Sequence, residues 1–334
     1  MRLILVFLSL LLAAASAMPQ DAHPHEESLP AWFAETFLDL REDVAEAAKA
    51  KKRLLVYFGQ DGCPYCRELL QTNFSQKRIV DKTQRHFTAV AINIWGDREV
   101  TTMDGRTQTE KEFARALGVQ FTPSVLFLDE KGQVVARMNG YYPPHRFEAV
   151  LDYVAGHMER KRSITAHLRT AAREAASPDL HAEPFLIPPP HDLRRRPGGK
   201  PLAVLFETRH CAGCDELHRD GFRRPEMRNL LNGFDIVRFP LFGTEKITAP
   251  DGRATTAGDW ARRLKIAYSP SIVFFAPDGR EVFRIEAYLR PFHLAGSFEY
   301  VATGAYASEP EFQRFLQGRA GRLRERGEAV ELWK

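Results

Sequence analysis

The sequence predicts an α/β protein of two tandem domains, each a mixed β-sheet flanked by helices. Three observations support this fold class. The chain has 334 residues, of which 44% are hydrophobic, and this is enough to fill two cores. Its two halves repeat one another at a long period. Within each half, short apolar runs alternate with helical patterns and end in a tight hairpin.

The internal repeat covers most of each half. A shift of 148 residues places 57–74 (YFGQDGCPYCRELLQTNF) on 205–222 (LFETRHCAGCDELHRDGF), and a shift of 147 places 104–132 on 251–279. The first pair of segments aligns two cysteines, and the second aligns an Asp-Gly-Arg turn and a Pro-Ser pair. Solenoid repeats are only about 20–50 residues long, so this period indicates tandem domains.

Each element of the first unit follows from a local pattern. The apolar run 53–59 predicts a strand, and Pro64 suits the first turn of the helix behind it. An Asp-Gly turn interrupts the polar excursion 96–108, and a proline precedes the third strand. The expected elements are a strand (53–59), a helix (from the cysteine pair to about 86), a strand (87–95), a helix (109–117), two strands (124–128 and 133–138) and a helix (144 to about 160). Alternating elements followed by a hairpin predict a mixed sheet with helices on both faces.

The domain boundaries follow from composition. An amphipathic segment (29–51) precedes the first unit, and a further helix is expected over 158–176. The next 24 residues contain three consecutive prolines and a Gly-Gly pair, which is typical of a linker. The predicted organisation is a signal peptide (1–17), a first domain (29–176), a Pro/Gly-rich linker (177–200), a second domain (201–320) and a C-terminal tail (321–334).

The N-terminal segment indicates where the protein is located, and the net charge of the chain indicates which partners are not expected. The first 17 residues (MRLILVFLSLLLAAASA) have one basic residue, an apolar stretch and an Ala-Ser-Ala site, the pattern of an export signal. An uncleaved membrane anchor is the alternative, although the stretch is shorter than the roughly 20 residues that span a bilayer. We expect a periplasmic or secreted mature protein. The net charge of +4 forms no basic stripe, so nucleic acid is not an expected partner.

All four cysteines lie in two C-x-x-C pairs, Cys63 with Cys66 and Cys211 with Cys214. A stabilising disulfide usually closes a long loop, because a longer loop restrains the unfolded chain more. The short spacing therefore favours redox chemistry over stabilisation. A cysteine in the first helical turn lies beside free N–H groups and the positive end of the helix dipole, which stabilise a thiolate. We predict that Cys63 and Cys211 attack a disulfide and that Cys66 and Cys214 resolve the mixed disulfide.

A proline at the entrance of an apolar strand forms the second repeated signal. It occurs as Thr122-Pro123 in the first unit and as Ser269-Pro270 in the second, about equally far behind each cysteine pair. Proline cannot donate to a central ladder, so it should begin the strand and can be cis. His210 directly precedes Cys211 and either lowers the pKa of that thiol or is a surface residue without a role.

With a C-x-x-C pair at a helix start and a proline loop in both halves, the chain resembles the thioredoxin superfamily. "GCPYC" has the form seen in glutaredoxins, whereas the export signal and the excursion "WGDREVTTMDG" are more similar to exported SoxW-type thioredoxins of sulfur-oxidising bacteria. The resemblance implies two thioredoxin-like domains and disulfide exchange through the four cysteines without a cofactor or metal. It also implies substrate binding beside the proline loops, at Thr122, Pro123, Ser269 and Pro270. No residue matches the buried acid of thioredoxins, and neither motif reads Trp-Cys-Gly-Pro-Cys.

We therefore expect an exported thiol-disulfide oxidoreductase that reduces protein disulfides and receives electrons from a membrane-bound thiol reductase. An oxidant or isomerase with the same residues is the first alternative, because the redox potentials set the direction. A non-catalytic binding module with permanently oxidised pairs is the second. Zinc shared by the two pairs is disfavoured, since ribbon-type sites separate their pairs by only about 15–20 residues. Neither pair is followed by the histidine of a haem attachment motif.

Overall fold

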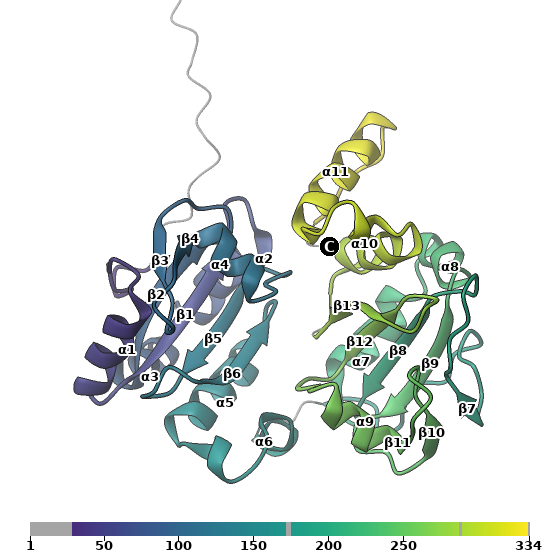
Figure 1. Cartoon of the computed structure of the whole chain (residues 1–334), viewed down its shortest axis with the longest axis horizontal. Coiled ribbons are helices and arrows are strands. Elements are labelled where there is room, and N and C mark those ends of the chain that lie inside the picture. Colours follow the sequence, from purple (N-terminus) through teal and green to yellow (C-terminus); the bar gives the residue numbers. More distant parts are fainter. Residues whose placement is uncertain (1–28, 172–174, 287–288, 333–334) are drawn as a thin grey trace, which may run out of the picture.

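The computed structural model of the chain describes residues 29–171, 175–286 and 289–332 and shows two α/β domains side by side (Figure 1). The expected signal peptide over 1–17 lies outside the described residues. Within the described ranges, no helix is both long and apolar enough to cross a membrane.

The first domain contains the predicted mixed sheet. Its order is β2-β1-β5-β6, with β1 (Arg53–Gly59) parallel to β2 (Phe87–Asn93) and antiparallel to β5 (Ser124–Leu128), which pairs in turn with β6 (Val134–Asn139). Every residue of β1 and β5 is buried, because helices cover both faces of the sheet. Both strands have the predicted bounds. The polar excursion folds into a small hairpin of β3 (Glu99–Thr101) and β4 (Thr107–Thr109).

The helices of the first domain are shorter than the predicted ones. They are α1 (Leu40–Lys49), α2 (Pro64–Glu68), the π-helix η1 (Leu69–Asn73), α3 (Lys77–His86), α4 (Glu110–Ala116), α5 (Pro144–Ala155), the 3-10 helix η2 (Met158–Arg160) and α6 (Ile164–Ala171). The expected continuous helix from the cysteine pair to about 86 is wrong, because the chain breaks after η1. There the buried Asn73 side chain donates to the Tyr142 carbonyl at 3.0 Å. The expected continuous helix over 158–176 is also wrong, since its described residues divide into η2 and α6 with a break between them.

The second domain repeats this plan, which confirms the fold class. Its sheet order is β13-β12-β8-β9, built from β8 (Leu202–Glu207), β9 (Asp235–Pro240), β12 (Ser271–Phe275) and β13 (Glu281–Ile285). A hairpin of β10 (Lys246–Thr248) and β11 (Ala254–Thr256) matches the one in the first domain. The remaining elements are α7 (Ala212–Glu216), the π-helix η3 (Leu217–Gly221), α8 (Pro225–Leu231), α9 (Ala257–Arg263), α10 (Pro291–Ala302), the 3-10 helix η4 (Ala305–Ala307) and α11 (Phe312–Glu325).

The segment expected as a linker lies along the second domain. Its short strand β7 (His191–Asp192) pairs in parallel with β10, and the Ile187 amide donates to the Ile236 carbonyl at 2.9 Å. Leu193 is buried in the core of the same domain. At the other end of the domain, α11 continues past residue 320 to Glu325. The segment 177–200 is therefore a packed part of the second domain.

The two domains exchange one aromatic side chain each. Phe121 joins the core cluster of the second domain, where its ring centroid lies 5.4 Å from that of Phe312. Tyr268 joins the core cluster of the first domain, with its ring centroid 5.0 Å from that of Tyr142. Both residues stand two positions before the repeated proline. Each proline loop is consequently fixed at the boundary between the domains.

Candidate active sites

Both C-x-x-C pairs form disulfides at the junction between a strand and a helix. The Cα atoms of Cys63 and Cys66 are 5.2 Å apart, as are those of Cys211 and Cys214. Cys63 caps the N-terminus of α2, and its Sγ accepts a hydrogen bond from the Cys66 amide at 3.1 Å. Cys211 caps α7 in the same way and accepts from the Cys214 amide at 3.1 Å. The leading sulfur of each pair thus lies where an N–H group stabilises a thiolate.

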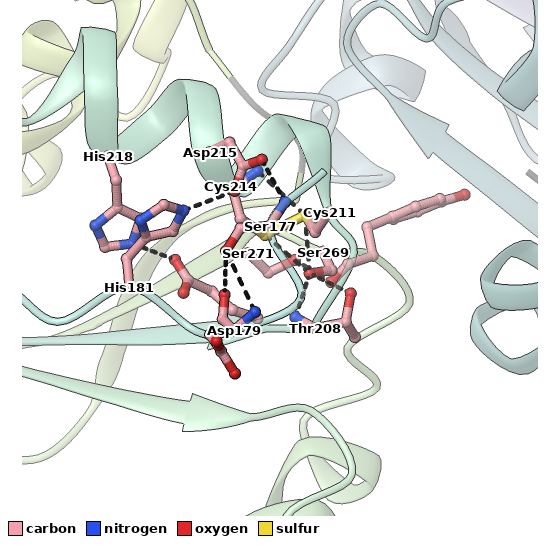
Figure 2. Close-up of a disulfide and its surroundings, with 12 residues drawn as sticks. Ser177, Asp179, His181, Thr208, Cys211, Cys214, Asp215, His218, Ser269 and Ser271 are labelled. Carbon is pink, nitrogen blue, oxygen red and sulfur yellow. Dashed lines mark hydrogen bonds and ion pairs between the residues drawn. A yellow bond between two sulfur atoms is a disulfide. The ribbon is translucent and has the colours of Figure 1, made fainter. Parts of the chain in front are cut away.

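The proline loops contact the disulfides. The Thr122-Pro123 and Ser269-Pro270 peptide bonds are cis. The Thr122 carbonyl oxygen lies 3.5 Å from Cys63 Sγ. In the second domain, Ser269 Oγ lies 3.3 Å from Cys214 Sγ and 3.5 Å from Cys211 Sγ (Figure 2). The structure therefore brings the cysteines and the predicted substrate-binding residues together in each domain, while substrate binding itself stays a prediction.

The first disulfide is covered by the second domain. Cys63 is 3% exposed and Cys66 is 2% exposed, and the cavity that Cys63 lines measures about 190 Å³. Side chains of α10 and α11 form one wall of this cavity. Tyr65, inside the motif, lies with its ring centroid 4.9 Å from the His293 ring and accepts a hydrogen bond from the Arg290 amide at 3.0 Å. The helices of one domain therefore lie on the motif of the other.

Hydrogen bonds of the Gln60 side chain connect helix α11, which covers the first disulfide, to the first proline loop. The Gln60 side chain accepts from Trp95 Nε1 at 2.6 Å. Its amide nitrogen lies 3.0 Å from Thr122 Oγ1 and 3.0 Å from Gln313 Oε1 on α11. Burial, with a smaller contribution from the Arg319 charge, lowers the pKa of His293 to about 3, so this covering side chain is neutral. Sequence reasoning missed this network, because its members come from both halves of the chain.

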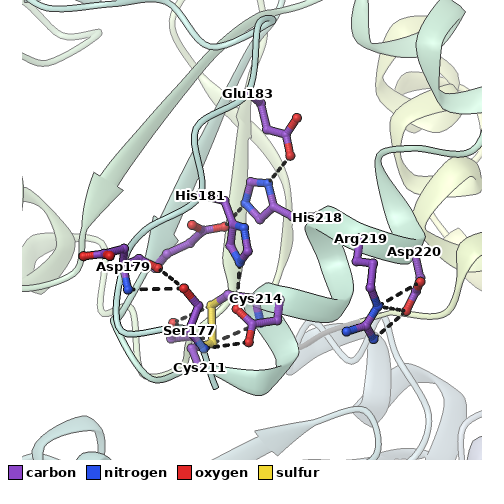
Figure 3. Close-up of polar contacts among 12 residues, drawn as sticks. Ser177, Asp179, His181, Glu183, Cys211, Cys214, His218, Arg219 and Asp220 are labelled. Carbon is purple, nitrogen blue, oxygen red and sulfur yellow. Dashed lines mark hydrogen bonds and ion pairs between the residues drawn. A yellow bond between two sulfur atoms is a disulfide. The ribbon is translucent and has the colours of Figure 1, made fainter. Parts of the chain in front are cut away.

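The second disulfide lies beside a cluster of two histidines and three carboxylates (Figure 3). The rings of His181 and His218 stack with centroids 4.6 Å apart. His181 Nε2 lies 2.7 Å from Asp215 Oδ1. His218 lies between two acids, with Nε2 2.8 Å from Glu207 Oε1 and Nδ1 3.0 Å from Glu183 Oε1. The cluster fastens the segment 177–200 to the helix that carries the cysteines.

Electrostatics favour a charged His218. Burial lowers the pKa of His218, but the hydrogen bonds and charges of Glu207 and Glu183 outweigh this effect and raise it above the ordinary value. Burial raises the pKa of Asp215, yet hydrogen bonds from the Ser177 amide and His181 lower it overall. The cluster is thus an ion-pair network. No group of three or more potential ligands within the described residues has a metal-binding arrangement.

Glu207 is the acid that sequence reasoning missed. Its side chain is 0% exposed at the end of β8, and its Oε2 has no hydrogen-bond partner among the described residues. The available signal was an acid that ends an apolar strand (PLAVLFE) four residues before Cys211. The equivalent position of the first domain is Gly59, so the two sites differ chemically. His210 is exposed and adopts a left-handed φ of 54°, with its amide donating to the Ser177 carbonyl at 2.9 Å.

Both halves of the chain match one family model. A family model described as a thioredoxin-like domain matches residues 40–155 and again 194–302. Similar solved structures include a thioredoxin-fold protein from Helicobacter pylori (27% identity, covering 34% of this chain and 74% of that one, TM-score 0.31). A thioredoxin from Thermus thermophilus is 24% identical over 35% of this chain and 83% of its own (TM-score 0.28). A putative disulphide-isomerase from Bacteroides thetaiotaomicron is 24% identical over 36% and 93% (TM-score 0.30). No curated protein matches the sequence.

The two matched segments together span more than half of the chain, and each contains one cysteine pair and one proline loop. A disulfide-forming C-x-x-C pair whose leading sulfur caps a helix is suited to thiol-disulfide exchange. The chain belongs to the thioredoxin-like domain family and is a thiol-disulfide oxidoreductase with two such domains.

Proposed function

We propose that the protein works after export, in the periplasm or outside the cell, as a reductant of protein disulfides, and that a membrane-bound thiol reductase supplies its electrons. The observation that carries the exchange chemistry is the hydrogen bond from each resolving cysteine's amide to the leading sulfur, beside a cis-proline loop. The reducing direction rests instead on the charge beside the second pair. The pattern of the first 17 residues supports export, because it contains a short apolar stretch and a cleavage site.

The chemistry needs only the four cysteines and an electron donor. The Cys63 thiolate attacks one sulfur of a substrate disulfide, whose S–S bond breaks as the other sulfur leaves and takes up a proton. The Cys66 thiolate then attacks Cys63 and releases the first substrate sulfur, so that two electrons have reached the substrate. The product is the Cys63–Cys66 disulfide of the structure. The donor must return two electrons and two protons for another cycle.

An acidic side chain beside the second pair supports the reducing direction. Asp215 follows Cys214 directly, and although burial raises its pKa, hydrogen bonds from the Ser177 amide and from His181 lower it overall and stabilise its negative charge. A nearby negative charge raises the free energy of a thiolate and thereby favours the disulfide. A dithiol whose disulfide is favoured is the stronger reductant.

A redox titration tests the direction. The mature full-length protein is equilibrated in thiol buffers, free thiols are alkylated, and the two pairs are quantified separately by mass spectrometry. We expect potentials near about −270 mV, the value of reducing dithiols. Potentials near about −120 mV would make the protein an oxidant. A second pair that never becomes reduced would make the second domain a binding module.

A trapping experiment tests the order of attack at the first site. Cys66→Ser should accumulate a mixed disulfide with a protein substrate through Cys63, because the resolving thiol is gone. Cys63→Ser is the matched control and should capture nothing through Cys66, because only the Cys63 sulfur caps α2 and accepts a hydrogen bond from its first turn. Trapping through Cys66 in the control would reverse the assigned roles.

A further inference from the structure

A cavity of about 800 Å³ lies between the domains and opens onto Cys211, the leading cysteine of the second pair. The first domain contributes residues of α5 and α6 to its walls, and the second domain contributes the loop before Cys211 and the residues before Pro270. Small-molecule sites typically measure about 300–1,000 Å³. The cavity therefore has the size of a site for a small organic ligand with a disulfide at one end.

Three guanidinium groups give this cavity a positive charge. Arg146, Arg169 and Arg209 line it, and within the described residues none of them forms an ion pair with a carboxylate. Arg146 Nη2 lies 3.5 Å from the Ser269 carbonyl oxygen, beside the proline loop. The Arg169 guanidinium carbon lies 4.7 Å from the centre of the Phe242 ring, which orients that side chain. Arginines without a carboxylate partner in the protein favour carboxylate groups on a ligand.

The acid among the lining residues is turned toward a histidine. Glu207 is 0% exposed, and its Oε1 lies 2.8 Å from His218, so its charge is partly compensated inside the protein. The other walls include apolar side chains from both domains, namely Leu168, Leu180, Leu241 and Tyr268. A few cationic groups in a largely apolar enclosure fix the orientation of a small anionic ligand.

The cover from the first domain restricts the size of the ligand. A folded protein that presents a disulfide to Cys211 has to insert it between that cysteine and the residues of α5 and α6 that line the same cavity. A small disulfide fits within the volume of about 800 Å³. The two sites therefore differ. The cavity at the first disulfide, beneath α10 and α11, measures only about 190 Å³, whereas the cavity at the second disulfide measures about 800 Å³ and is lined by three arginines.

We propose that Cys211 and Cys214 exchange with a small disulfide that carries carboxylate groups, bound by Arg146, Arg169 and Arg209. This inference rests on the thiol-disulfide exchange proposed above and names its substrate class at the second site. The Cys211 thiolate attacks the small disulfide, one anionic thiol leaves with a proton, and a mixed disulfide forms. Cys214 then attacks Cys211 and releases the second anionic thiol, so two electrons pass from the dithiol to the small disulfide.

The test uses the full chain with Cys63→Ser and Cys66→Ser, so that only the second pair reacts. The reduced protein is mixed with oxidised glutathione, which carries several carboxylates, or with cystamine, a disulfide of similar reactivity with two ammonium groups. Oxidation of the pair is followed by stopped-flow fluorescence and quenched alkylation. We expect the anionic probe to react faster, with an advantage that shrinks as ionic strength rises.

Arginine variants of the same chain then test whether the arginines of the cavity cause the preference for the anionic probe. Arg169→Gln combined with Arg209→Gln should slow the anionic probe by about tenfold or more, the lower end of electrostatic effects on association, and leave cystamine unchanged or faster. Arg223→Gln removes the same charge from an exposed position of the second domain outside the cavity and should change neither rate.

The possible outcomes distinguish a failure of the proposed substrate class from a failure of the proposed disulfide exchange. Equal rates for both probes in the parent chain, or equal slowing of both by the arginine variants, would overturn the anionic-disulfide site and leave disulfide exchange intact. A second pair that reacts with neither probe, although it titrates in a redox buffer, would also overturn the site. A pair that never becomes reduced would instead remove the proposed exchange at this domain.

Discussion

At the scale of single residues, the clearest electrostatic feature is His218 between the buried Glu207 and the half-buried Glu183. Its imidazole lies within 3.0 Å of carboxylate oxygens of both Glu207 and Glu183 and is 1% exposed. A histidine whose native pKa is raised stabilises the folded state fully below its unfolded value of about 6.5. That contribution is lost as pH rises through the raised native pKa. The network should therefore hold the segment 177–200 more tightly in mildly acidic solution than in alkaline solution.

The pKa of His218 can be measured by NMR titration of its ring protons. We expect a midpoint above the ordinary value for histidine in the native protein, and a lower midpoint in Glu207→Gln, which keeps a hydrogen-bond acceptor but loses the charge. His86 is an internal control, because burial and neighbouring cations lower its pKa and it lies in the other domain. A His218 midpoint at or below the ordinary value, or one that Glu207→Gln leaves in place, would contradict the ion-pair interpretation.

At the scale of elements, α11 decides access to the first disulfide. Leu316 of α11 lines the cavity beside Cys63 and packs against Gly296 of α10. A Cβ atom at position 296 would lie too close to Leu316 Cδ2, so Gly296→Ala must displace that side chain. Overpacking of this kind costs about 1–3 kcal/mol. We expect Cys63 of the reduced variant to be alkylated roughly tenfold faster, as a mass-mapped time course would show.

Gly321→Ala is the matched control for this experiment. Gly321 lies on α11 itself, where an added Cβ meets no atom within 4 Å. Alanine in place of glycine should stabilise the helix by about 0.5–1 kcal/mol. Its alkylation rate should therefore equal or fall below that of the parent protein. Equal rates in Gly296→Ala and Gly321→Ala would show that α11 does not control access.

The elements also show what could be predicted from the sequence. The bounds of β1 and β5 follow from apolar runs that end at glycine or begin after proline, because local signals define both ends. The break after Asn73 could not be predicted, since it depends on a hydrogen bond to Tyr142, a residue distant in sequence. The cysteines and prolines were recognisable because their spacing recurs in both halves. Gln313, which reaches Gln60 from the other domain, carried no such signal.

At the scale of the whole molecule, the exchanged aromatic residues make each domain part of the other's core. Phe121 lies in the second-domain cluster and Tyr268 in the first-domain cluster, both less than 9% exposed. Domains joined only by a linker usually have independent stabilities. Here, unfolding of either domain exposes an aromatic ring of its neighbour. We therefore expect the intact protein to unfold in a single calorimetric transition.

Phe121→Ala tests this coupling. Loss of a buried phenylalanine ring costs about 3–5 kcal/mol, and here the loss falls on the contact between the domains. The variant should unfold in two separate transitions. In its reduced form under native conditions, both Cys63 and Cys211 should be alkylated faster than in the parent protein.

Phe234→Ala is the control and removes a ring that the second domain contributes to the same core. It should lower the transition temperature without exposing Cys63, because the interdomain ring stays in place. Two transitions in the parent protein, or equal exposure of Cys63 in both variants, would mean that the exchanged rings do not couple the domains.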